Sequence, residues 1–490
     1  MAGKEQQIKN SFIYLIPVIV SSLIPLLTLP VFTRILTKGD FGVYALAQIY
    51  AVFMSGLANF GLIISYERNF FQYRDKKKAS ELLYSTLIFV ITVFSVFVFL
   101  TYLFKAHISR LIIGTSQHSG LLFWAFCAVG FASFKTYYLT YFKNIENAKS
   151  FTRYTIYESL IGAFSSLFLV AYLRTGVIGL VWGQLLASFI VFFILTTNFL
   201  KILPFSFNWL ILKESLKLSY PLAPRVFIGV IGQQFDKYMI GLLATIGGVG
   251  IYSIGQRISY MVFTYMTAIQ NVYSPQVYRR MFDKAEKGGE SIGVYLTPFV
   301  YLSIAAALMI SLFSEEIISI LTPKSYHGAI DIVIILSMFY GSMFFGKQPQ
   351  LVFAKKTHIT LLLSIVTIAL NIGLNIPFIM KWGTIGAAWA TLSAGLISGS
   401  ISFAVSQYYY KIKWEYKKIG AIFLIFFVSS ILMILLRNFM VGYSIRFFIK
   451  SIFIGCYLYL GVKINVITME NFVIAKNTIL LKANPSFYRK

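Results

Sequence analysis

The chain has 490 residues, of which 58% are hydrophobic and 12% are charged, and its formal net charge is +26. Soluble domains are about one quarter charged, so this composition excludes an ordinary soluble protein and indicates a polytopic membrane protein. The positive charge does not indicate nucleic-acid binding, because Lys and Arg cluster in short loops between apolar runs, where orientation in a bilayer accounts for them.

Apolar runs near the length of a membrane-crossing helix recur along almost the whole chain and predict an all-α protein with about fourteen transmembrane helices. The first run exceeds the apolar core of a signal peptide and lacks a small-residue cleavage site, so we expect it to be retained. The expected spans are 11–33, 42–66, 82–104, 119–142, 155–173, 176–200, 217–243, 249–273, 292–313, 329–353, 359–380, 384–408, 418–436 and 444–463.

The distribution of Lys and Arg between alternate loops predicts the orientation of these helices. The loops on one side hold 28 of these residues and the loops on the other side hold 9. Because the side richer in positive charge is cytoplasmic in membrane proteins, both termini should be cytoplasmic. We therefore expect a multi-pass membrane protein with this orientation.

Two short sequences occur twice at nearly the same offset. The run 42–48 (GVYALAQ) returns at 250–256 (GIYSIGQ), and 176–182 (GVIGLVW) returns at 383–389 (GTIGAAW). These repeats predict two pseudo-symmetric six-helix lobes inserted in the same direction, an arrangement typical of transporters. The expected domains are a first lobe over 1–200, a cytoplasmic linker over 201–216, a second lobe over 217–410, extra helices over 411–463 and a cytoplasmic tail over 464–490.

The seventh and eighth spans carry the charges that point most directly to function. Arg225 and Asp236 are eleven positions apart, close to three helical turns, so they share a face. A charge at mid-membrane costs about 2.5–3.5 kcal/mol, which favours a water-filled cavity around it. We predict that Arg225, Lys237 and Arg257 form a cationic site for an anionic headgroup, with Asp236 as a charge partner or coupling residue.

Simpler interpretations of these residues remain open. Arg225 and Lys237 can extend to the membrane surface from helix ends, and Asp236 can serve only to neutralise Lys237 or Arg257. Three other charged residues within spans are weaker candidates for the cavity, namely Lys135, Glu158 and Lys347. Lys135 and Lys347 are also suited to anchoring near the cytoplasmic surface.

The sequence offers little support for catalysis or for a bound cofactor. The four histidines form no zinc-binding pattern, and no phosphate-binding loop or nucleophile motif occurs in a suitable context. Asp331, which follows His327, is expected in the first turn of a helix. Cys127 and Cys456 lie in separate apolar runs and are expected to be small core residues. We therefore predict a transporter with no catalytic residues, metal or cofactor.

Four segments resemble parts of a known family. The run 30–46 (PVFTRILTKGDFGVYAL) resembles the opening of Wzx-type bacterial polysaccharide-export flippases, and 236–240, 250–257 and 321–326 are similar to later landmarks of that family. The resemblance implies the multidrug/oligosaccharidyl-lipid/polysaccharide superfamily fold. It also implies alternating-access translocation of an undecaprenyl-pyrophosphate-linked oligosaccharide for surface polysaccharide synthesis, such as O-antigen, capsule or exopolysaccharide. Membrane lipid and other polysaccharide assembly proteins would be its partners.

Two other functions are compatible with the same membrane architecture. A cation-coupled drug antiporter of the same superfamily would often carry an acid in the first span, and residues 11–32 contain none. A membrane-embedded enzyme of polysaccharide synthesis would need a large external loop or a positioned base, whereas the predicted external loops are short. The flippase is the prediction that accounts for most of these features.

Overall fold

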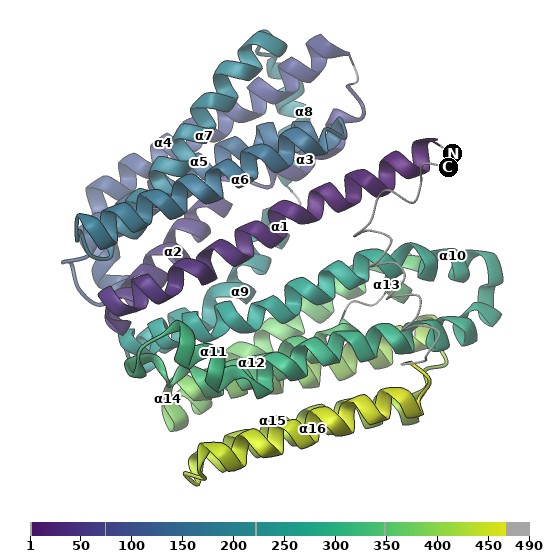
Figure 1. Ribbon diagram of the computed structural model, residues 1–490. Helices are drawn as coiled ribbons and strands as arrows, with labels where there is room; N and C mark the ends of the chain where they lie inside the picture. Colours follow the sequence, from purple (N-terminus) through teal and green to yellow (C-terminus); the bar gives the residue numbers. More distant parts are fainter. Residues whose placement is uncertain (1, 74, 221–222, 347–348, 467–490) are drawn as a thin grey trace, which may run out of the picture. The chain divides into compact units, whose positions relative to one another are not determined.

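The computed structural model describes residues 2–73, 75–220, 223–346 and 349–466, and every regular element in these ranges is a helix (Figure 1). The helices of the first half are α1 (Ala2–Ile35), α2 (Lys38–Asn59), α3 (Leu62–Phe70), α4 (Lys76–Ile113), α5 (Ser119–Asn144), α6 (Ala148–Leu167), η1 (Phe168–Tyr172), α7 (Ile178–Ile202), α8 (Trp209–Ser219) and α9 (Ala223–Leu243). They are followed by α10 (Ile246–Leu312), α11 (Ser314–Leu321), η3 (Lys324–Tyr326), α12 (Ala329–Ser342), η4 (Met343–Gly346), α13 (Pro349–Phe353), α14 (Thr357–Tyr409), α15 (Tyr416–Asn438) and α16 (Tyr443–Lys463).

The helices confirm a polytopic membrane protein. Within the described residues, 10 helices are long and apolar enough to cross a membrane. Two of the long helices each include two predicted spans: α10 includes 249–273 and all but the last residue of 292–313, and α14 includes 359–380 and 384–408. In α14 the backbone leaves the helical conformation at Gly383 (φ 60°, ψ −139°), between its two predicted spans.

The chain divides into two compact units that differ from a simple division at mid-sequence. The first unit comprises 1–255, 316–329 and 368–390, and the second comprises 256–315, 330–367 and 391–490. Each of the long helices α10 and α14 therefore contributes to both units. The two predicted lobes, 1–200 and 217–410, remain a prediction.

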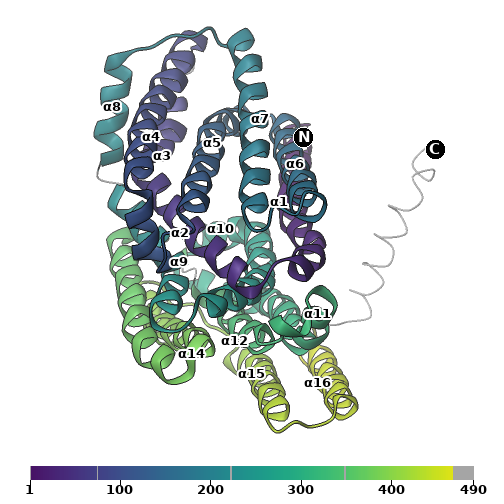
Figure 2. The ribbon, with the colours of Figure 1, turned by 90° about the vertical axis from the view of Figure 1, so that its left-hand side faces the viewer.

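Within the first unit, α5 packs against α2, α4 and α7, and α6 packs between α1 and α7 (Figure 2). The core between these helices is aromatic: Phe199 of α7 lies against Tyr138 and Phe142 of α5, with ring centroids 4.6 and 5.1 Å apart. Helices in a membrane do not gain stability by hiding an apolar face from water. Their packing therefore depends on close contacts made by aromatic rings and small residues.

Local sequence signals set the beginnings of several helices. Thr37 caps α2 by accepting a hydrogen bond from the Asp40 amide, and the Asp40 side chain accepts one from the Thr37 amide in return. The Asp75 side chain caps α4 by accepting from the Lys78 amide, and the Asn147 side chain caps α6 by accepting from the Ser150 amide. Such side chains satisfy amide groups that the first helical turn leaves without a partner.

Two expected elements differ from the structure. The predicted span 42–66 is interrupted, because Phe60 and Gly61 adopt left-handed conformations (φ 50° and 71°) that end α2 and begin α3. The second half of the expected linker 201–216 forms the start of α8, which Asn208 caps. Asn208 also donates from its side chain to Glu81 (2.9 Å) and from its amide to Ser85 (2.8 Å), so this segment is fixed to α4.

The second repeated sequence has a common backbone feature in its two copies. Gly176 and Gly383, each the first residue of its copy, both have positive φ, 71° and 60°. A positive φ is unfavourable for a residue with a side chain, which is why glycine suits both positions. The repeat is therefore visible in backbone conformation as well as in sequence.

Candidate functional site

Asp236, the one acid in the sequence of the seventh predicted span, is 6% exposed, and two neighbouring helices donate hydrogen bonds to its carboxylate. Tyr252 of α10 donates to Oδ2 (2.9 Å), and Asn375 of α14 donates to Oδ1 (2.8 Å). Asn375 is fully buried and also lies 3.1 Å from Asn371 Oδ1. These contacts form a polar cluster of the first unit, where a carboxylate in an apolar helix would otherwise be costly.

The structure joins two of the weaker candidates in one ion pair. The Lys135 ammonium on α5 contacts the Glu158 carboxylate on α6, and the side chains are 8% and 20% exposed. Ser188 of α7 donates a further hydrogen bond to Glu158 Oε1 (3.0 Å). The pair therefore links three helices of the first unit, and each charge compensates the other.

The structure describes two of the remaining predicted cations, Lys237 and Arg257. Lys237 is half-buried, and its ammonium donates to Gln234 on the same helix (3.1 Å). Arg257 is exposed on α10, in the part that belongs to the second unit. Arg225 and Lys347 have side chains outside the described residues. A shared cationic cavity formed by Arg225, Lys237 and Arg257 thus stays a prediction.

Several polar contacts in the first unit were not predicted from the sequence. Gln184 of α7 donates to the Tyr44 hydroxyl (2.5 Å) and accepts from the Gln48 side chain (2.9 Å), both on α2. Asn59 of α2 donates to Ser133 of α5 (2.6 Å). The sequence feature that could have indicated these contacts is the presence of uncharged amide side chains within apolar runs. One of them, Gln48, is the last residue of a repeated sequence. Amides and hydroxyls offer both donors and acceptors, the groups that sugar hydroxyls also use.

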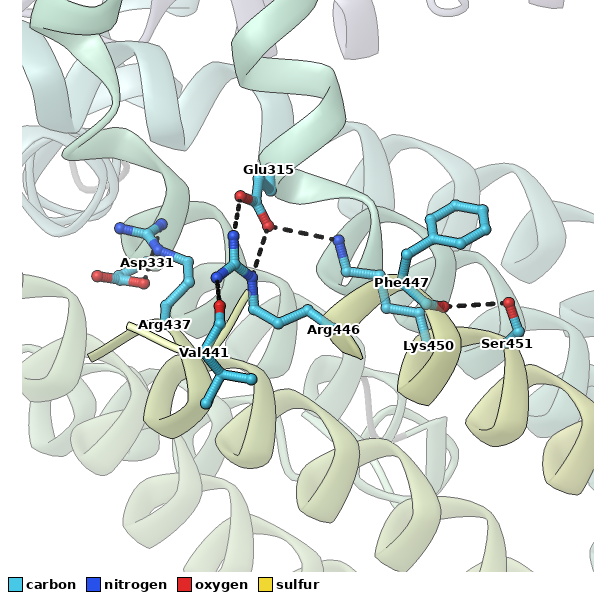
Figure 3. A network of polar contacts seen from close by, with 8 residues as sticks. All are labelled: Glu315, Asp331, Arg437, Val441, Arg446, Phe447, Lys450 and Ser451. Atoms are coloured by element: carbon cyan, nitrogen blue, oxygen red, sulfur yellow. Dashed lines mark hydrogen bonds and ion pairs between the residues drawn. The ribbon is translucent and has the colours of Figure 1, made fainter. Parts of the chain in front are cut away.

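A separate cluster of charges lies in the second unit (Figure 3). Arg446 of α16 makes two contacts with Glu315, from Nη2 to Oε1 (2.6 Å) and from Nε to Oε2 (3.3 Å). Lys450, which is 2% exposed, lies 3.6 Å from Glu315 Oε2. Asp331 is in the first turn of α12, as predicted, and pairs with Arg437 of α15 (3.2 Å).

This cluster sets the charge state of Glu315, which lies between two predicted spans. Burial acts to raise the pKa of Glu315, but the hydrogen bond and charge of Arg446, with the charges of Lys450 and Arg437, outweigh burial and hold the pKa below its ordinary value. Glu315 therefore acts as a fixed anion that attaches α16 to α11.

Groups of His, Cys, Asp and Glu suited to a metal ion do not occur among the described residues. The charged and polar groups instead form isolated pairs and hydrogen-bonded clusters inside membrane helices. Such an arrangement can bind polar or charged parts of a molecule and can change partners when helices move.

Comparison with known proteins finds one protein family and one curated relative with similar sequence. A family model described as "Polysaccharide biosynthesis protein" matches residues 8–281. A curated relative from Haloferax volcanii, "Probable low-salt glycan biosynthesis flippase Agl15", is 25% identical over 202 residues, which is 39% of this chain and 42% of that protein. The match therefore spans less than half of the relative's length.

Solved structures share the fold at low sequence identity. "Lipid II flippase MurJ, inward closed conformation" has a TM-score of 0.67 and 17% identity, covering 92% of this chain and 98% of the other. An inward-facing multidrug resistance MATE family transporter of the MOP superfamily has a TM-score of 0.58 and 14% identity, with coverage of 84% and 98%. These likenesses establish a fold found in membrane transporters.

Proposed function

Because the chain belongs to the polysaccharide biosynthesis protein family, we propose that it is a flippase that moves a lipid-linked oligosaccharide across the membrane by alternating access. The observation that carries this proposal is the family match over more than half of a chain whose membrane helices contain buried charges. The names of the glycan flippase from Haloferax volcanii and of the lipid II flippase support the same class of substrate.

The proposed substrate is an undecaprenyl-pyrophosphate-linked oligosaccharide in a bacterial plasma membrane, with both termini of the protein in the cytoplasm. Arg225, Lys237 and Arg257 would attract the pyrophosphate, since the guanidinium group forms paired hydrogen bonds with phosphate oxygens. The polyprenyl chain would remain in lipid. No catalytic step is assigned, because flipping leaves the substrate covalently unchanged.

Asp236 is the residue that we propose for coupling to an ion gradient. Its buried carboxylate is held by Tyr252 and Asn375, from two other helices, so a change in its charge would alter contacts between α9, α10 and α14. Asp236→Asn should keep the shape of the site and remove the charge. We expect it to abolish gradient-driven flipping while the protein still folds.

The direct test is a vesicle assay with purified protein and an undecaprenyl-pyrophosphate-linked oligosaccharide. The fraction of glycan that becomes accessible to an external lectin would be measured over time, with and without an ion gradient. Wild-type protein should raise the flipping rate at least tenfold over empty vesicles. Failure with the native substrate and a gradient, together with efflux of organic cations by the same preparation, would instead indicate a drug antiporter.

A further inference from the structure

The beginnings of α2 and α10 approach each other so closely that only glycine fits at two positions of the first unit. A Cβ atom on Gly42 would lie 1.9 Å from the carbonyl oxygen of Ile246, and a Cβ atom on Gly250 would lie 2.0 Å from the carbonyl oxygen of Lys38. Both distances are far below van der Waals contact, and in both the obstructing atom belongs to the backbone. The two helices therefore meet main chain against main chain.

The two contacts are the same contact made by the two copies of the repeat. The offset of 208 that relates the first pair of repeated sequences converts Gly42 into Gly250, and it also converts Lys38 into Ile246. Lys38 lies four positions before Gly42, and Ile246 lies four positions before Gly250. Each glycine thus contacts the residue that precedes the other glycine by four positions. Such reciprocity is the geometry of a self-complementary contact around a two-fold axis.

Hydrogen bonds from further along the chain surround this contact. The Tyr326 hydroxyl donates to the carbonyl oxygen of Leu36 (2.6 Å), and the Thr33 hydroxyl donates to the carbonyl oxygen of Leu321 (3.1 Å). Tyr326 also lies edge-on to Phe41, with ring centroids 5.8 Å apart. Tyr326 and Leu36 are 1% and 4% exposed, so these contacts are buried within the first unit.

The loop charges assign this end to the outside of the membrane, since Arg34, Lys38 and Lys324 belong to the side poor in Lys and Arg. We infer that Gly42 and Gly250 form the contact that closes the external end of the transport path, and that opening outward separates each glycine from its opposing carbonyl. This inference rests on the proposed function for its direction. Close contacts between helix ends can separate and re-form as the helices move.

The inference is tested by adding one methyl group to either glycine. Gly42→Ala and Gly250→Ala would be compared with Gly399→Ala, a control on α14 whose added Cβ would meet nothing within 4 Å. In protein with Cys127 and Cys456 replaced by Ser, spin labels at Arg34→Cys and Ser325→Cys would report the distance across the contact. Tyr326→Phe serves as a second variant, because it removes one hydrogen bond without adding bulk.

We expect wild type and Gly399→Ala to give one short distance, and both contact variants to give a longer, broader distribution with flipping reduced at least tenfold. Tyr326→Phe should shift part of the population in the same direction. Unchanged distances in monodisperse Gly42→Ala and Gly250→Ala would overturn the inference, as would an effect of one glycine without the other. If the distances lengthen but the wild-type protein flips no lipid-linked oligosaccharide, the closing contact stands and the proposed function fails.

Discussion

At the scale of single residues, both compact units contain ion pairs with little exposure to solvent. Lys135 is paired with Glu158 inside the first unit, whereas Arg446 binds Glu315 with two nitrogen atoms in the second. Loss of one partner from a buried pair leaves an uncompensated charge and is more damaging than loss of an exposed pair. We therefore expect loss of a buried pair to lower the free energy of unfolding more than loss of an exposed pair.

Removal of Arg446 should destabilise the attachment of α16. We expect Arg446→Ala to lower the free energy of unfolding by about 1–3 kcal/mol, because Glu315 would lose both hydrogen bonds from Arg446 and keep an ion pair with Lys450 at 3.6 Å. Thermal unfolding of the purified protein in detergent measures the effect. The matched control is Lys143→Ala, which breaks an exposed pair with Glu67 and should change stability by less than about 1 kcal/mol. Equal effects of the two variants would contradict a structural role for the Glu315 cluster.

The lowered pKa of Glu315 gives a prediction for pH. A carboxyl group whose pKa is lower in the folded protein stabilises it above the pKa of the unfolded chain, about 4.3, and this contribution is lost as the pH falls through the folded value. We therefore expect the difference in melting temperature between wild type and Glu315→Gln to be largest above pH 5 and to shrink below pH 4. A difference that grows toward acid pH would show that the sign is wrong.

At the scale of helices, one predicted span is divided into two helices by the structure. The span 42–66 is continuous in hydropathy, yet Phe60 and Gly61 divide it into α2 and α3. A Cβ atom on Gly61 would lie 3.3 Å from the Ser219 carbonyl oxygen, near the end of α8. The break thus fits a close approach between helices that are distant in sequence.

Substitution of Gly61 tests this explanation. Gly61→Ala should lower the free energy of unfolding by about 1–2 kcal/mol, because alanine disfavours a φ of +71° and its methyl group would meet α8. Gly420→Ala on α15 is the control, since its Cβ would meet nothing within 4 Å and glycine within a helix is about 1 kcal/mol less favourable than alanine. The control should be neutral or stabilising, as measured by thermal unfolding. Stabilisation by Gly61→Ala would show that the break is not required.

Across the whole molecule, the orientation in the membrane can be tested without a substrate. Lys324 and Lys417 are both exposed and belong to loops assigned to opposite sides by the count of Lys and Arg. In protein with Cys127 and Cys456 replaced by Ser, an impermeant maleimide added to intact cells should label Lys324→Cys and spare Lys417→Cys. After the cells are opened, both should react. The opposite pattern would invert the proposed topology, and with it the side on which the glycine contact closes.

The sequence by itself determined the membrane class, most of the helices and the repeat, because these depend on local properties: hydropathy over about 20 residues, capping side chains and recurring glycines. The resemblance carried by 30–46 also led to the family that the comparisons confirm. Only the tertiary structure decided which residues distant in sequence contact one another. Asp236 accepts a hydrogen bond from Asn375, which is 139 residues away along the chain. Likewise, Gly42 meets the backbone of Ile246 because helices distant in sequence pack together, and no local pattern encodes that distance.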